Sequence, residues 1–191
     1  MKKFLLITFC ILLVLGGAGA WWYYHNFRAS KFTPVQLSQT EKKVLDDKIN
    51  TAQAPAAPNS PPEKTIVLTE REINGWLERQ GLGETVKVSI SGGSIAASAL
   101  VPLNKDVPFL GGHTMRIKVA LHPQMDAKNH FGLFVSDVSV GGISPPNAWL
   151  GGLKGTDLLA DSSADATAVA FAKGIKSFDI SSGEIRVVLD E

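Results

Sequence analysis

The hydrophobic pattern of this 191-residue chain begins with one uninterrupted apolar run. Residues 4–24, FLLITFCILLVLGGAGAWWYY, carry no charge and follow Lys2 and Lys3. A helix over these 21 residues, rising about 1.5 Å per residue, would reach roughly 31 Å and match a hydrocarbon core of about 30 Å. The run predicts a signal-anchor, a transmembrane segment within residues 1–27 that contacts the lipid bilayer through residues 4–24.

The end of this run permits two interpretations. Residues 18–20 (AGA) have the small-x-small form that a signal peptidase accepts, so cleavage after Ala20 would give a secreted protein. The four aromatic residues that follow would be an unusual mature N-terminus, but they suit a membrane-interface belt. We therefore favour retention in the cytoplasmic (inner) membrane as a single-pass protein, with the N-terminus in the cytoplasm and the C-terminal domain extracytoplasmic. The predicted belt is Trp21, Trp22, Tyr23 and Tyr24.

Residues 28–64 predict a connection between membrane and domain. In LSQTEKKVLDDKI, Ser38 and Glu41 have capping-box spacing, and Val44, Leu45 and Ile49 then fall on one helical face. The following stretch, TAQAPAAPNSPPEK, is too rich in proline, alanine and small polar residues to bury a face. We expect a juxtamembrane helix followed by an extended spacer, and an extracytoplasmic domain over residues 65–191.

The domain opens with an amphipathic pattern. In LTEREINGWLERQGLG, Thr69 and Glu72 form a second capping box, and Ile73, Trp76 and Leu77 make an i, i+3, i+4 apolar stripe. The pattern predicts a short helix with one apolar side.

The period then changes from 3.6 residues to two. Alternating segments predict a hairpin over residues 85–101, strands near 114–123 and 131–140, and a closing hairpin over 178–189. Between them, SPPNAWLGGL predicts a short helix capped by Ser144 with Trp149, Leu150 and Leu153 on its apolar side. The alanine-rich segment 162–174 predicts another helix. The order of elements favours an α+β domain, an antiparallel β-meander packed by short helices.

Composition and motifs exclude several functions. The 19 basic and 18 acidic residues, net charge +1, are scattered and provide no nucleic-acid-binding surface. Cys10 is the only cysteine, and the four histidines lack metal-ligand spacing. Catalytic and nucleotide-binding motifs are absent from the sequence. We therefore expect a non-enzymatic protein with no catalytic residues, no metal and no cofactor, and rank an enzyme third among the alternatives.

A family resemblance points the same way. The succession of LTEREINGWL, alternating strands, VSVGGISPP leading into NAWLGGL, and SFDISSGEIRVVL resembles small membrane-anchored bacterial proteins of the YpmS-like type. It is more distantly similar to envelope proteins with TULIP-like lipid-binding folds. The resemblance covers Ile66 to Leu189. It implies an extracytoplasmic domain tethered by one helix, with a lipid or other apolar molecule as its ligand.

Two amphipathic helices over one face of a meander can leave an apolar groove that would accept an acyl chain. The favoured interpretation of Trp76 and Trp149 is nevertheless that both complete the core, because buried tryptophan is most often packing. A different class of function is a docking or assembly subunit that contacts a partner in a membrane protein complex. The candidate groove residues are Ile73, Trp76, Leu77, Trp149 and Leu150.

Overall fold

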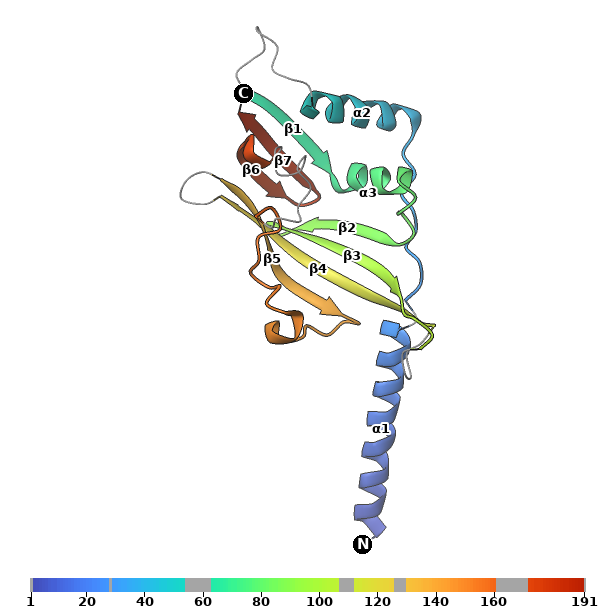
Figure 1. Cartoon of the computed structure of the whole chain (residues 1–191). Coiled ribbons are helices and arrows are strands. Elements are labelled where there is room, and N and C mark those ends of the chain that lie inside the picture. The colour runs from blue at the N-terminus through green and yellow to red at the C-terminus, as the bar shows by residue number, and fades with distance from the viewer. Residues whose placement is uncertain are drawn as a thin grey trace.

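The computed structural model describes residues 2–27, 29–53, 63–106, 112–125, 130–160 and 172–190. Over these residues the protein is α+β, with antiparallel sheets, as the hydrophobic pattern predicts (Figure 1). The elements are α1 (Lys2–Phe27), α2 (Gln39–Gln53), β1 (Glu63–Thr69), α3 (Glu70–Arg79), β2 (Val86–Ser91), β3 (Ser94–Pro102), β4 (Thr114–Met125), β5 (Phe131–Val140), the 3₁₀ helix η1 (Asn147–Leu150), β6 (Ile175–Ser181) and β7 (Glu184–Asp190).

The predicted antiparallel meander is confirmed as a four-stranded sheet in the order β2-β3-β4-β5. Its first hairpin pairs Ser91 with Ser94 across a two-residue turn. The turn residues Gly92 and Gly93 have φ of 58° and 74°, the left-handed conformation that tight hairpins need and that glycine adopts without steric cost. The glycine pair of SGGS therefore closes this hairpin at its expected position.

The second sheet contains a strand that the sequence pattern did not predict. The expected closing hairpin is formed by β6 and β7, and β1 pairs with β7 to give the order β1-β7-β6. Ile66, Ile175 and Leu189, one from each strand, form a buried cluster. Phe131 at the start of β5 meets Phe178 of β6 edge to face, with ring centroids 5.2 Å apart. This contact joins the cores of the two sheets.

Helix α3 begins where β1 ends, through the predicted capping box. The Thr69 hydroxyl accepts a hydrogen bond from the Glu72 amide (3.2 Å), and the Glu72 carboxylate accepts one from the Thr69 amide (2.8 Å). The predicted box at the start of α2 is also formed, between Ser38 and Glu41. Both helix starts are therefore confirmed.

The open edge of β2 is closed by side chains of α3. Asn74, only 5% exposed, accepts from the Val88 amide (2.9 Å) and donates to the Val88 carbonyl (2.7 Å). Two residues on, the Ile90 amide donates to the Glu70 carboxylate (2.9 Å), and the Ile90 carbonyl accepts from the amide of Gly183 in the β6–β7 turn (3.2 Å). The edge groups of β2 thus pair with α3 and with the second sheet instead of another strand.

The predicted helix in SPPNAWLGGL is wrong in type and in cap. The segment forms only the single 3₁₀ turn η1, with Pro146 at its N-cap position and no side-chain capping bond. Ser144 instead donates to the Asp137 carboxylate. The Pro-Pro pair and Gly151, whose φ is 64°, leave room for one turn between them. The predicted alanine-rich helix falls mostly on residues 161–171, outside the described residues.

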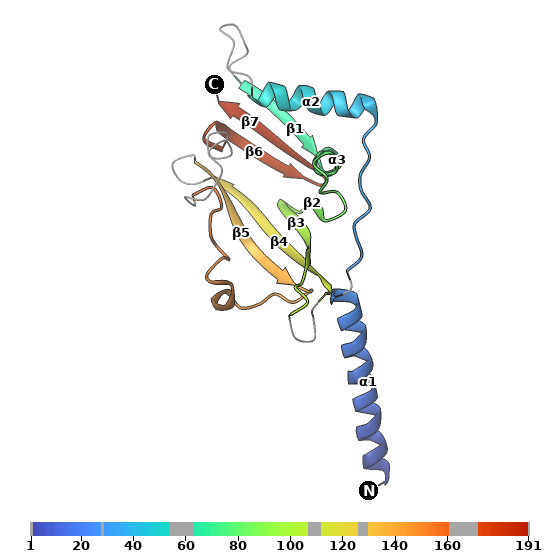
Figure 2. The same ribbon diagram turned by 45° about the vertical axis from the view of Figure 1, so that its right-hand side comes forward.

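Helix α1 extends away from the domain, with the N-terminus at its far end (Figures 1 and 2). The chain after α1 is held along the meander, where the Ala29 amide donates to the Thr114 carbonyl (3.4 Å) and the Phe32 amide to the Glu84 carbonyl (2.9 Å). The Arg116 guanidinium lies 5.1 Å from the centre of the Phe32 ring. Among the described residues, no helix has both the length and the apolar character required to cross a membrane, so the predicted transmembrane segment is not confirmed and stays a prediction.

The two hydrogen bonds between Asn74 and Val88 lead to a prediction. Asn74→Ala should lower the free energy of unfolding by about 1–3 kcal/mol, because the Val88 amide and carbonyl would lose their partner in a buried position. Asn74→Asp should also destabilise, since a carboxylate keeps the shape and the acceptor but loses the donor to the Val88 carbonyl. Urea denaturation followed by circular dichroism measures both. Gln80→Ala, an exposed change at the end of the same helix, is the control. Equal stability of Asn74→Ala and this control would contradict a stabilising role of the Asn74–Val88 hydrogen bonds.

Candidate functional site

Helix α2 packs on α3, at the end of the domain opposite to α1 (Figure 1). Leu45 of α2 is only 2% exposed, and Leu37, just before α2, is also buried. Leu37 lies so close to Gly75 of α3 that a Cβ on that glycine would overlap its side chain. The segment predicted as a juxtamembrane connection therefore supplies core residues to the domain.

Ion pairs at the helix surfaces hold the same arrangement. They join Arg71 Nε to Glu41 Oε1 (2.8 Å), Lys48 Nζ to Glu72 Oε1 (2.6 Å) and Arg79 Nη1 to Asp46 Oδ1 (2.6 Å). Each pair connects α2 to α3, so the contact has one register along the helices.

An apolar cleft of about 210 Å³ lies between α2, α3 and the end of β1. Trp76 is 42% exposed beside it, so the indole is neither fully buried nor free of the fold. The lining residues are Leu45, Ile49, Leu68, Ile73 and Trp76. The cleft has the apolar lining expected of the groove, but it is smaller than the roughly 300–1,000 Å³ of common ligand pockets.

The five candidate groove residues are not gathered at one place. Ile73 and Trp76 line the cleft, whereas Leu77 is buried in the fold. Trp149 and Leu150 lie on η1, far from α3 in both ribbon views (Figures 1 and 2). Trp149 is 81% exposed, so its side chain is not part of the core, and it does not line the cleft.

Leu45, Ile49 and Leu68 line the cleft but were not among the predicted groove residues. For Leu45 and Ile49, the hydrophobic pattern of the sequence contains a signal. Leu45 and Ile49 fall on the apolar face of the helix predicted within residues 37–49, which the structure extends to Gln53, and an apolar face needs an element to cover it. The Pro- and Ala-rich stretch after that helix indicates a spacer, so the sequence pattern alone placed the helix outside the domain and gave its apolar face no partner.

The loop that follows β5 is organised by side chains. Asn147 accepts from the Lys154 amide (2.9 Å) and donates to the Lys154 carbonyl (3.0 Å), which closes the segment around η1. The Lys154 ammonium lies 2.8 Å from the Asp137 carboxylate and donates to Ser144 (2.7 Å). Lys154 and Ser144 lower the pKa of Asp137 through these hydrogen bonds. We call residues 143–156 the η1 loop.

The η1 loop also covers the outer edge of β5. The Val135 amide donates to the Thr156 carbonyl (3.0 Å), and the Gly155 amide donates to the Val135 carbonyl (2.7 Å). The Asp157 carboxylate accepts from the Leu133 amide (2.9 Å). Both edges of the meander are therefore paired over part of their length, β2 by α3 and the β6–β7 turn, and β5 by the end of the η1 loop and the adjacent Asp157.

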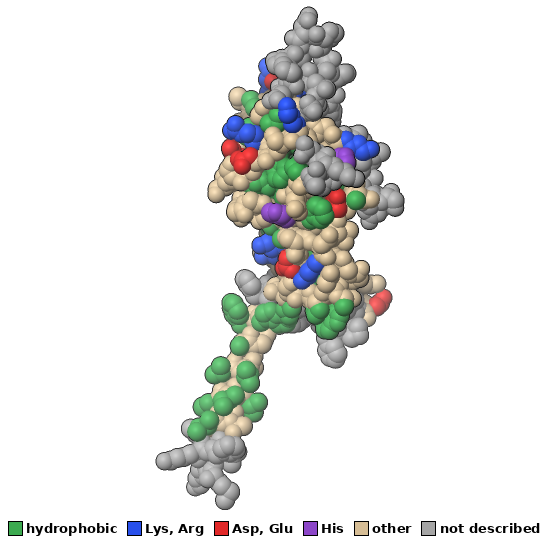
Figure 3. Space-filling model, turned by 90° about the vertical axis from the view of Figure 1, so that its left-hand side faces the viewer, with side chains coloured by type: hydrophobic (Ala, Val, Ile, Leu, Met, Phe, Trp, Pro, Cys, Tyr) green, Lys and Arg blue, Asp and Glu red, His purple; other side chains and the backbone are tan. Residues whose placement is uncertain are grey.

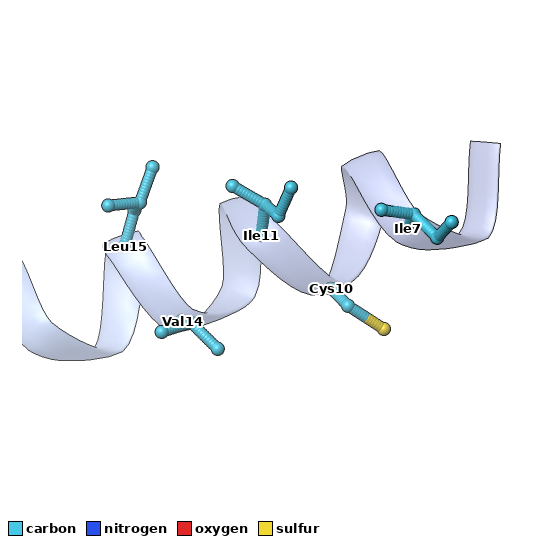
Figure 4. A pocket seen from close by; sticks show the side chains of 5 residues that line it. All are labelled: Ile7, Cys10, Ile11, Val14 and Leu15. Carbon is cyan, nitrogen blue, oxygen red and sulfur yellow. The ribbon is translucent and has the colours of Figure 1, made fainter. Parts of the chain in front are cut away.

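A second apolar surface lies on α1 itself. Ile7, Cys10, Ile11, Val14 and Leu15 surround about 350 Å³ of open space, and Figure 4 shows that all five side chains come from one helix. Of the predicted belt, Trp21 is exposed and Trp22 half-buried, while the side chains of Tyr23 and Tyr24 lie outside the described residues. The α1 surface is therefore an uncovered helix side and not a cavity.

The residues that the structure describes contain no cluster of metal-ligating side chains. No group of three or more His, Cys, Asp or Glu side chains there could hold a metal ion. His130 and Asp157 line a hollow of about 220 Å³, where one oxygen of the Asp157 carboxylate, Oδ1, accepts hydrogen bonds from the Leu133 and Leu159 amides.

Comparison with known proteins gives no match to a family model, a curated protein or a solved structure. The resemblance to YpmS-like and TULIP-like proteins therefore remains an expectation from short motifs.

The contact between α2 and α3 should weaken in acid. Hydrogen bonds from Arg71 and Ser38 lower the pKa of Glu41 from 4.5 to about 2. Burial raises the pKa of Glu72, but Lys48 and Thr69 outweigh this effect and lower it overall. A carboxylate with a depressed folded-state pKa stabilises the fold above its ordinary pKa, and this stabilisation is lost as the pH falls through the folded-state value.

We therefore expect thermal unfolding at pH 7 to occur at a higher temperature than at pH 3, with part of the difference due to Glu41. At pH 7, Glu41→Gln should unfold at a lower temperature than the unmodified protein. The difference between the two unfolding temperatures should shrink as the pH falls from 4.5 towards about 2. Asp106→Asn, a change at an exposed residue away from α2 and α3, serves as the control. A difference in unfolding temperature that is the same at pH 7 and pH 3 would contradict the stabilising role of the Glu41 carboxylate.

Proposed function

We propose that the protein is a non-enzymatic envelope protein held in the cytoplasmic membrane by α1, with its N-terminus in the cytoplasm and its domain outside. The observation that carries this proposal is the surface of α1. Its large apolar side chains from Ile7 to Leu15, and Trp21 further on, are between 53% and 70% exposed. The helix extends away from the sheets and from the other helices that the structure describes (Figure 1).

Exposure of this kind is unfavourable in water, at roughly 25 cal/mol per Å² of apolar surface. Lipid hydrocarbon covers such a helix without any specific partner, and the backbone polar groups are already satisfied within the helix. Lys2 and Lys3 precede the apolar run and favour a cytoplasmic N-terminus. The aromatic residues near the C-terminal end of α1 are the types that membrane interfaces contain.

Membrane fractionation tests the anchor. The full-length protein should stay in the membrane pellet after a sodium carbonate wash. The double variant Ile11→Lys and Val14→Lys should move to the supernatant, because each lysine near the centre of a transmembrane helix costs about 2.5–3.5 kcal/mol. Lys87→Gln, an exposed change on β2, is the matched control. A soluble protein whose N-terminus maps to Trp21 would overturn the anchor and leave the secreted alternative.

For the domain, we propose that the cleft between α2 and α3 takes a single apolar chain end. The support is its lining, which is aliphatic and aromatic throughout. A space of about 210 Å³ suits part of one acyl chain and not a whole two-chain lipid. The alternative is a docking subunit, in which the cleft receives an apolar side chain of a partner in a membrane protein complex.

Native mass spectrometry of the full-length protein released from membranes distinguishes these functions. We expect a retained single-chain amphiphile, absent from Ile49→Trp, where a larger ring would fill the cleft. Lys87→Gln, an exposed change outside the cleft, should retain it. A bound protein in place of the amphiphile would favour the docking subunit, and an adduct that persists in Ile49→Trp would show that the cleft is not its site.

A further inference from the structure

We propose that the η1 loop is a second contact with the membrane surface, which rests on the proposed anchoring by α1. The proposed contact residues are Ile143, Trp149 and Leu153 of the loop together with Val101 at the end of β3. Their exposed fractions are 53%, 81%, 37% and 36%, respectively. We call these four residues the apolar end surface, and its occupant is the headgroup and upper acyl region of the bilayer that α1 enters.

The position of this surface is set by hydrogen bonds to the first residues after α1. Ala29 donates to Thr114 at the start of β4, and Thr114 pairs with Pro102 at the end of β3, next to Val101. On the other side of β4, the Gly141 amide after β5 donates to the Arg116 carbonyl (2.9 Å). The ends of β3 and β5 are therefore fixed near the exit of α1.

The ribbon views agree with this placement. In Figures 1 and 2 the η1 turn lies level with the C-terminal end of α1, to one side of it. Figure 3 shows hydrophobic side chains gathered on the end of the domain from which α1 extends. A bilayer that holds the apolar part of α1 would therefore have its surface next to the η1 loop.

The loop is built to present Trp149 outwards. Asn147 closes the segment through two hydrogen bonds with Lys154, and Gly151 and Gly152 turn the chain with φ of 64° and 85°. A flexible loop would let the indole fold back onto the domain. Here Asn147 and Lys154, one on each side of Trp149, are hydrogen-bonded to each other. These hydrogen bonds therefore close the loop around Trp149, whose side chain is exposed.

The polar groups of the loop are compatible with a headgroup contact. The charge of Lys154 is paired with Asp137 at 2.8 Å, so this pair adds no net charge. Indole rings favour the headgroup level because they combine a large apolar body with one N–H donor. Isoleucine and leucine beside the indole add apolar area that water would otherwise cover.

Tryptophan fluorescence in lipid vesicles tests the proposal, because the tryptophans of the chain lie in three different places. The full-length protein is reconstituted in phosphatidylethanolamine–phosphatidylglycerol vesicles, with acyl chains either unmodified or brominated near the headgroup. One variant keeps Trp149 alone, through Trp21→Phe, Trp22→Phe and Trp76→Phe. A second keeps Trp76 alone, and a third keeps Trp21 and Trp22, through the corresponding changes to phenylalanine.

We expect a large loss of fluorescence in brominated vesicles for the protein with Trp149 and for the protein with Trp21 and Trp22. The protein with Trp76 should show little loss, because α3 lies towards the opposite end of the domain (Figure 1). The thermal transition of each variant should match that of the unmodified protein, which verifies that the loop and domain are folded.

The outcomes separate the two proposals. Quenching of Trp21 and Trp22 without quenching of Trp149 would overturn the second contact and leave the anchor. Absence of quenching at Trp21 and Trp22 would overturn the anchor itself. Fluorescence of Trp149 that is unaffected by bromine but shifts with protein density in the vesicles would assign the apolar end surface to a second copy of the chain and overturn the lipid contact.

Discussion

The pairing of Asn74 with the edge of β2 is the constraint on which the arrangement of the domain depends. A strand at a sheet edge needs partners for its outward amides and carbonyls. Here Asn74 and Glu70 supply most of them, and Gly183 of the β6–β7 turn supplies the last. Because the Glu70 amide also donates to the Gly183 carbonyl (2.7 Å), the helix is bonded to both sheets at one point. The orientation of α3 is therefore determined by backbone pairing and not by apolar packing alone.

Once α3 is oriented, the position of α2 follows. The ion pairs between the helices are partly exposed, and solvent-screened pairs of this kind contribute little to stability. Burial of Leu37 and Leu45 stabilises the contact more strongly, since a fully buried leucine contributes about 1.5–3 kcal/mol. The ion pairs select the register along the helix, and the leucines hold it there. The cleft beside Trp76 is lined by both helices, so it exists only while α2 packs on α3. Its shape therefore depends on α2, which lies before the predicted start of the domain at residue 65.

Local signals predicted the local structure well. Both capping boxes and the hairpin turn at Gly92 form as expected, because each is decided by a few adjacent residues. Strand β1 was missed because its partner β7 lies more than a hundred residues away and its own seven residues run directly into α3. The position of Trp149 was misjudged because apolar spacing suggested a helix, whereas the flanking Pro-Pro and Gly-Gly pairs permit one 3₁₀ turn. A single turn has no apolar face long enough to pack on a sheet.

The two ends of the domain have different relations to the proposed membrane. Helix α1 and the η1 loop lie at one end, and α2 with its cleft lies towards the other (Figures 1 and 2). With two points of contact, α1 and the apolar end surface, the domain would be unable to tilt freely about its tether, so the cleft would stay above the bilayer. An acyl chain could then enter the cleft only after leaving the membrane, which loses roughly 0.8 kcal/mol for each CH₂ group exposed on the way. A cleft held at this distance is better placed to receive a chain end or an apolar side chain presented by a partner than to extract a lipid from the same bilayer.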